Sequence, residues 1–121
     1  MKKILVIDDQ AEVIDIIEDF LYRKYEIYAA KTTARAISML RTNNFDLILL
    51  DILLPGMNGI EFLQYTRAQS WYDNIPVIFM SSQSSYETVK QAAHLSPEGY
   101  IKKPIEKKLL LEKIKAVIGE Y

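Results

Sequence analysis

Short apolar runs alternate with longer segments of helical periodicity along the whole chain. The apolar runs are rich in Ile, Val and Leu, which is typical of buried strands in a parallel sheet, and they are Lys3–Ile7, Glu26–Ala30, Asp46–Leu50, Val77–Met80 and Gly99–Lys102. The segments between them repeat apolar residues at helical spacing, and they are Gln10–Arg23, Thr33–Arg41, Gly59–Ala68, Ser84–His94 and Glu106–Ile118. This alternation predicts an α/β fold, a doubly wound five-stranded parallel sheet with five helices on its two faces.

Composition narrows the class of protein. The chain has 121 residues, half of them hydrophobic, with 15 Lys and Arg against 16 Asp and Glu. A net charge of −1 provides no broad basic surface for nucleic acid, and the absence of cysteine excludes disulfides and thiolate metal sites. No apolar stretch reaches membrane-spanning length, and the N-terminus lacks the pattern of a secretory signal. We expect one cytoplasmic domain over residues 1–121 that binds neither membrane nor nucleic acid, either standing alone or as part of a longer protein.

Three aspartates stand where two of the predicted strands end. Asp8 and Asp9 follow the first apolar run, and Asp51 follows the third. Ligands of open α/β sheets bind beyond the carboxyl ends of the strands, so we expect these carboxylates to share one crevice. Three like charges in one crevice repel each other, and a bound cation relieves the repulsion. Hard oxygen ligands with access to solvent suit Mg²⁺, so the pattern predicts a magnesium site beside a reactive aspartate.

Two further residues belong to the same predicted crevice. Ser81 ends the fourth apolar run, and Lys103 follows the fifth, directly before Pro104. The lysine supplies a compact positive charge for a phosphoryl oxygen, and the serine hydroxyl supplies a hydrogen bond. The Lys103–Pro104 bond is also a candidate for a cis peptide. A carboxylate nucleophile, a metal site, a hydroxyl and a cation together are typical of phosphoryl transfer.

The chain resembles the receiver domains of two-component response regulators, including the single-domain receivers of the chemotaxis type. Five motifs carry the resemblance, in the family's order and at its spacings, and they are Ile4–Asp9, Asp46–Asp51, Pro55–Gly59, Pro76–Ser82 and Gly99–Pro104. Each motif alone is weak, but the set is highly specific. The resemblance implies a flavodoxin-like sheet with strand order 2-1-3-4-5. It also implies a phosphorylation-dependent signalling switch that catalyses its own phosphorylation and dephosphorylation, and is not otherwise an enzyme.

The resemblance implies a role for each residue at the metal and acceptor site. Asp51 would accept a phosphoryl group from a phosphohistidine of a sensor histidine kinase or phosphotransfer protein, or from acetyl phosphate. Asp9 and Asp51 would bind Mg²⁺ directly, and Asp8 would act mainly through water. The backbone carbonyl of Leu53 would complete the protein ligands.

The resemblance also implies how the signal would leave the site. Lys103 would pair with the phosphoryl oxygens, Ser81 would move towards the phosphoryl group, and Tyr100 would rotate inward behind it. These movements would change the face built from the fourth helix, the fifth strand and the fifth helix, where an unknown downstream protein would bind. That face includes Tyr86, Lys90, Tyr100, Lys102 and Lys107.

Three departures from the family's usual pattern affect these expectations. Ser82 replaces a frequent alanine, and Ser96-Pro97 replaces a frequent Gly-Ala before the fifth strand, which leaves the shape of that loop open. In the family, the positions of Leu53 and Gln83 flank the path of the hydrolytic water. An apolar Leu53 offers that water no hydrogen bond, so we expect slow self-dephosphorylation.

Two other functions fit parts of the sequence. A degenerate receiver would act only as a protein-binding module, although all five site residues are present. A Mg²⁺-dependent phosphatase with an aspartyl nucleophile would normally need a second carboxylate close by in the sequence. Here Asp51 is followed by Ile52, Leu53 and Leu54, which disfavours that chemistry.

Overall fold

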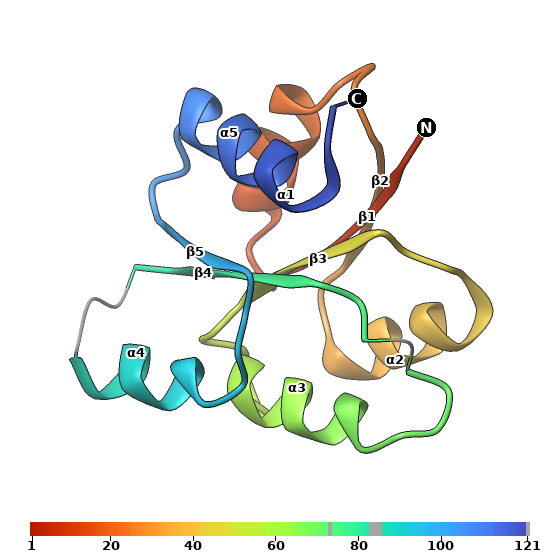
Figure 1. Ribbon diagram of the computed structural model, residues 1–121, viewed down its shortest axis with the longest axis vertical. Helices are drawn as coiled ribbons and strands as arrows, with labels where there is room; N and C mark the ends of the chain where they lie inside the picture. The colour runs from red at the N-terminus through yellow and green to blue at the C-terminus, as the bar shows by residue number, and fades with distance from the viewer. Residues whose placement is uncertain (73, 83–85, 121) are drawn as a thin grey trace.

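Five strands alternate with five helices in the computed structural model, which describes residues 1–72, 74–82 and 86–120 and, of residues 86, 87 and 89, the backbone alone (Figure 1). The elements are β1 (Lys3–Ile7), α1 (Ala11–Phe20), β2 (Glu26–Ala30), α2 (Thr33–Thr42), β3 (Leu47–Asp51), α3 (Gly59–Arg67), β4 (Val77–Ser81), α4 (Tyr86–Ala93), β5 (Gly99–Lys102) and α5 (Lys107–Ile118). Each helix in this described part of the chain is too short and too polar to cross a membrane.

The strands form one parallel sheet in the order β2-β1-β3-β4-β5, which confirms the predicted topology. The chain leaves β1 towards β2 on one side and later returns to β3 on the other, so the crevice of such a sheet lies between β1 and β3. Ile7 pairs with Leu50 across these two strands. The next residues along the two strands, Asp8 and Asp51, therefore reach the carboxyl edge of the sheet side by side.

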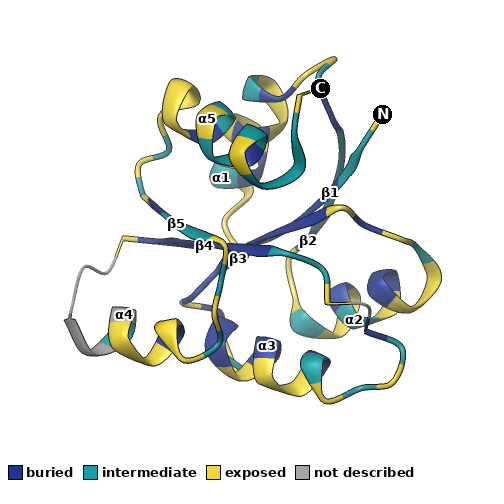
Figure 2. Ribbon diagram, in the orientation of Figure 1, coloured by how far each residue is buried: buried dark blue, intermediate teal, exposed yellow. Residues whose placement is uncertain are grey.

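Helices cover both faces of the sheet (Figure 1). Helices α1 and α5 pack on one face and α2, α3 and α4 on the other, and each layer has its own cluster of buried apolar residues. The central strands β3 and β4 are buried throughout, because helices lie on both sides of them (Figure 2). This two-sided burial explains why these strands read as continuous apolar runs instead of alternating ones.

Several element boundaries differ from the predicted ones. Helix α1 ends at Phe20 and not at Arg23, because Arg23 adopts a left-handed backbone with φ 63° and cannot continue the helix. Strand β4 includes Ser81, whose carbonyl accepts a hydrogen bond from the Lys103 amide at 3.0 Å. The predicted start of the fourth helix at Ser84 lies outside the described residues. The Lys103–Pro104 bond is cis, as expected.

The loop between α4 and β5 keeps a tight turn despite its unusual Ser96-Pro97 pair. Ser96 adopts φ 49°, a left-handed conformation that glycine reaches without steric cost. The Arg67 side chain donates a hydrogen bond to the Leu95 carbonyl, and the Glu98 amide donates to the Val77 carbonyl at 2.8 Å. These contacts tie the loop to α3 and to the start of β4.

The two ends of the chain meet at the amino edge of the sheet (Figure 1). The Lys2 ammonium donates hydrogen bonds to the backbone carbonyls of Ile118 and Glu120, the second at 3.4 Å. The Tyr25 hydroxyl donates to the Gly119 carbonyl at 3.4 Å. The end of α5 is therefore joined to the beginnings of β1 and β2.

Candidate functional site

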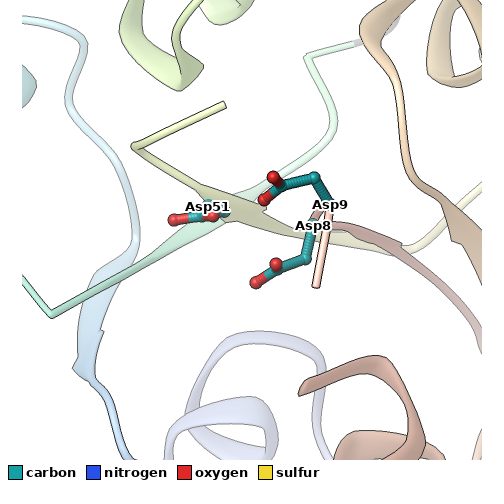
Figure 3. A group of neighbouring side chains, drawn as sticks. All are labelled: Asp8, Asp9 and Asp51. Carbon is teal, nitrogen blue, oxygen red and sulfur yellow. The ribbon is translucent and has the colours of Figure 1, made fainter. Parts of the chain in front are cut away.

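Three carboxylates meet at the carboxyl edge of the sheet, where β1 and β3 are neighbours (Figure 3). Asp8, Asp9 and Asp51 each offer an oxygen atom, and these atoms lie within 4.8 Å of one another. Asp8 is fully buried and Asp51 is 3% exposed, whereas Asp9 is exposed. The cluster thus has a buried wall and an open side that an ion can reach from solvent.

Backbone hydrogen bonds fix the two buried carboxylates. Asp8 Oδ1 accepts from the Gln10 amide at 2.9 Å, and Asp51 Oδ1 accepts from the Leu53 amide at 3.2 Å. Each carboxylate therefore closes a turn over the two residues that follow its strand, a local conformation that aspartate favours. The turns orient both side chains towards the same crevice.

Lys103 is the cation of the cluster. Its Nζ lies 2.8 Å from Asp8 Oδ2 and 3.4 Å from Asp51 Oδ2, and its side chain is only 12% exposed. Lys102 is exposed, in keeping with the alternation of side chains along a strand. Three negative charges against one positive charge leave a net charge of −2 when all four groups are ionised.

The electrostatics of Asp51 also favour a further cation. Burial raises the pKa of its carboxyl group, the negative charge of Asp8 raises it further, and Lys103 and the Leu53 amide act in the opposite direction. The ionised form is thus costly in this setting, and an added positive charge lowers that cost. The ligand atoms are hard oxygens, partly open to solvent, and this donor set fits Mg²⁺.

A cavity of about 210 Å³ opens beside the cluster and is lined by Asp9, Gln10, Asp51, Leu53, Ser82 and Lys103. Asp51, Lys103 and the exposed Asp9 thus face a shared space that solutes can enter. A larger cavity of about 480 Å³, between α1 and the start of α2, is lined by none of the predicted site residues.

Neither of the two residues predicted to move lines this cavity. Ser81 is the last residue of β4 and is 8% exposed, while the exposed Ser82 takes the place at the cavity wall. The Tyr100 ring stacks on Phe79 with 6.1 Å between ring centroids. Its hydroxyl is buried, finds no hydrogen-bond partner among the described residues, and has its pKa raised by that burial.

The lysines of the predicted output face are exposed, whereas Tyr100 is half-buried. Lys90 of α4, Lys102 of β5 and Lys107 of α5 are all exposed. The side chain of Tyr86 and all of Gln83 lie outside the described part of the chain.

Two contacts at the site were missed from the sequence. The Lys103 ammonium donates to Gln10 Oε1 at 3.1 Å, and a Cβ added at Gly59 would lie 2.3 Å from the Asp51 carbonyl oxygen. The signal for Gly59 was its place in the motif after β3. Gln10 carried no signal beyond following two aspartates, because an exposed glutamine ordinarily contacts only solvent.

Comparison with known proteins shows the family. The sequence matches the response regulator receiver domain over residues 4–115. It is 32% identical over 120 residues to the uncharacterized transcriptional regulatory protein YrkP of Bacillus subtilis, covering 98% of this chain and 50% of that protein. It is 31% identical over 117 residues to the chemotaxis protein CheY of Pseudomonas aeruginosa, covering 95% of this chain and 94% of that protein.

The fold gives the same result. The structure aligns with that of the chemotaxis protein CheY4 of Vibrio cholerae with a TM-score of 0.88 and 27% identity, covering 97% of this chain and 98% of the other. The chain spans about half the length of the Bacillus relative and nearly all of the Pseudomonas relative. Sequence, fold and acidic cluster agree, and the chain belongs to the response regulator receiver domain family.

Proposed function

We propose that the chain is a signalling switch that is turned on by phosphorylation of Asp51. The observation that carries the proposal is the grouping of Asp51 with Asp8, Asp9 and Lys103 beside an open cavity. This grouping supplies a nucleophile, a cation and a set of metal ligands within a few ångströms. Phosphoryl transfer relies on positioning and charge neutralisation, and these groups provide both.

The phosphoryl donor is a phosphohistidine of a sensor histidine kinase or phosphotransfer protein, or a small donor such as acetyl phosphate. A carboxylate oxygen of Asp51 attacks the phosphorus atom, the bond to the donor breaks, and its electron pair leaves with the imidazole or acetate. Lys103 faces the carboxylate at 3.4 Å and pairs with a phosphoryl oxygen. The burial of Asp51 limits its own hydration, which leaves the oxygen available for attack.

Asp9, Asp51 and the Leu53 carbonyl would hold Mg²⁺ directly, and Asp8 would hold it through water. When bound, the ion neutralises charge on the phosphoryl oxygens. The buried Asp8 remains paired with Lys103 and keeps the ammonium close to the acceptor.

The phosphoryl group then biases Ser81 and Tyr100. It adds negative charge and acceptor oxygens at the end of β3. Asp51 pairs with Met80 across β3 and β4, and Ser81 is the next residue of β4. Shifting a two-state equilibrium from about 1:99 to 99:1 takes roughly 5.5 kcal/mol. Charge-assisted hydrogen bonds contribute about 1.5–3 kcal/mol each, so two to four of them are sufficient. The changed α4-β5-α5 face then controls a downstream protein.

The test is the mass of the intact protein after incubation with acetyl phosphate and Mg²⁺, beside Asp51→Asn and beside a sample with EDTA. We expect the parent alone to gain one phosphoryl group, and only with the metal present. If neither acetyl phosphate nor a phosphorylated histidine phosphotransfer protein modifies the parent, the chain is a degenerate receiver that acts as a binding module.

A further inference from the structure

The Lys103 ammonium is held by three acceptors. Its Nζ lies 2.8 Å from Asp8 Oδ2, 3.1 Å from Gln10 Oε1 and 3.4 Å from Asp51 Oδ2. The Gln10 contact is a hydrogen bond, whereas the contacts with Asp8 and Asp51 are ion pairs, and Asp8 Oδ2 receives no hydrogen bond from the described residues. A phosphoryl oxygen that binds Lys103 from the cavity therefore competes with three oxygens that already surround the ammonium.

The three acceptors differ in what their loss would cost. Asp8 is fully buried, so releasing it would leave a charged carboxylate without its cation inside the protein. Asp51 is the phosphorylated residue itself and stays beside the new group. Gln10 is neutral and exposed, so water replaces its lost hydrogen bond. Gln10 is the acceptor that gives way.

The position of Gln10 is consistent with its displacement from Lys103. Its backbone amide is held by Asp8 Oδ1 at 2.9 Å, directly before α1. Its side chain makes no capping hydrogen bond to that helix and contacts Lys103, 93 residues further along the chain, instead. Both side chains line the cavity beside Asp51, which is the space that a phosphoryl group enters.

We propose that Gln10 is a positioning residue that occupies one donor of Lys103 until a phosphoryl oxygen displaces it. Gln10 and the phosphoryl group thus compete for the same N–H, and the glutamine sets how readily the site accepts a phosphoryl group. The proposal rests on the proposed phosphorylation of Asp51. It assigns to an exposed residue outside the family motifs a direct effect on the affinity of the site.

The experiment measures the affinity for beryllium trifluoride, a phosphoryl analogue, by isothermal titration calorimetry in saturating Mg²⁺. Gln10→Leu removes the acceptor and keeps a side chain of similar size. Exchange of a neutral hydrogen bond predicts about three- to tenfold tighter binding of the analogue by this variant. Gln64→Leu is the matched control, because Gln64 is also exposed but lies on α3 outside the cavity, and it should bind as the parent does.

A second arm shows whether Gln10 acts through Lys103. In a Lys103→Met background, Gln10→Leu should leave the affinity for the analogue unchanged, because the donor for which they compete is absent. The affinity for Mg²⁺ alone and the midpoint of thermal unfolding should be equal in the parent and Gln10→Leu. A purely structural role would shift that midpoint instead.

Two results overturn the inference. Gln10 does not compete for Lys103 if the parent binds the analogue but Gln10→Leu binds it no more tightly. The same follows if Gln10→Leu raises the affinity for the analogue equally in the Lys103→Met background. In either case the switch proposal stands. If the parent neither binds the analogue nor takes up a phosphoryl group from acetyl phosphate, both proposals fail.

Discussion

Substituting Gly59 tests how closely α3 is packed against the backbone of Asp51. Gly59 is the first residue of α3, and its amide donates to the Ile52 carbonyl at 2.8 Å. An alanine Cβ at this position would lie 2.3 Å from the Asp51 carbonyl oxygen and 2.9 Å from Ile52 Cα. Both atoms belong to the backbone and cannot rotate away. The methyl group must therefore push the start of α3 away from the end of β3.

Opposing effects determine the size of the change. Alanine gains up to about 1 kcal/mol over glycine within a helix. Overpacking costs about 1–3 kcal/mol, and the upper end applies here because backbone lies on the crowded side. Separating the two elements also weakens the hydrogen bond between Gly59 and Ile52, at a cost of about 0.5–1.5 kcal/mol. The steric effect prevails, and we expect Gly59→Ala to lower the free energy of unfolding by roughly 2 kcal/mol.

Urea unfolding measures this change, and Gly99→Ala is the matched control. A Cβ at Gly99 would meet only Ile78 Cγ1, at an ordinary 4.0 Å, so its effect should stay within about 0.5 kcal/mol. We also expect Gly59→Ala to react more slowly with acetyl phosphate, because the backbone of Asp51 has moved. Equal stabilities of the two variants would show that the reasoning from close packing is wrong.

Four further predictions follow from the site and its surroundings. Asp51→Asn should raise the free energy of unfolding by about 1 kcal/mol in urea without metal, because burial and the charge of Asp8 both penalise the ionised carboxylate; a loss of stability would contradict this. Mg²⁺ at a hundred times its dissociation constant should raise the free energy of unfolding of the parent by about 2.7 kcal/mol. At the same concentration it should raise that of Asp9→Asn by less, and thermal unfolding measures both. Burial raises the pKa of the Tyr72 phenol, so above about pH 10 the folded protein keeps a proton that the unfolded chain loses. The free energy of unfolding should therefore fall as the pH rises above about 10, and it should fall less steeply in Tyr72→Phe. Leu53→Asn should shorten the phosphoryl lifetime measured by intact mass, because a polar side chain in the cavity wall can bind the attacking water, and a parent lifetime of only seconds would refute slow hydrolysis.

The sequence predicts the acidic cluster because its position depends on strand ends alone. Asp8 and Asp51 each follow a run of buried apolar residues, and in a parallel sheet all such ends lie at one edge. The same reasoning places Lys103 after the fifth run. No detail of side-chain packing enters this argument, so a pattern of residue types is sufficient for it.

The sequence fails where a contact depends on tertiary packing or on a single backbone angle. Gln10 reaches Lys103 only because the fold brings the start of α1 close to the end of β5, and no local pattern encodes that contact. Arg23 and Ser96 adopt positive φ angles although neither is glycine. The sequence therefore lacks the glycine that would mark the end of α1 and the turn after α4. Ser82, rather than Ser81, lines the cavity because β4 extends one residue further than its apolar run.

The meeting of the chain ends also determines how the protein can be handled. Lys2 reaches the carbonyls of Ile118 and Glu120 at the amino edge of the sheet, whereas Asp51 lies at the carboxyl edge. A five-residue strand separates the two edges by about 16 Å, at roughly 3.3 Å per residue. A fluorescent label or a surface tether attached at either end would stay clear of the cavity. A short peptide joining the ends would likewise allow circular permutation, with new termini opened in a surface loop remote from Asp51.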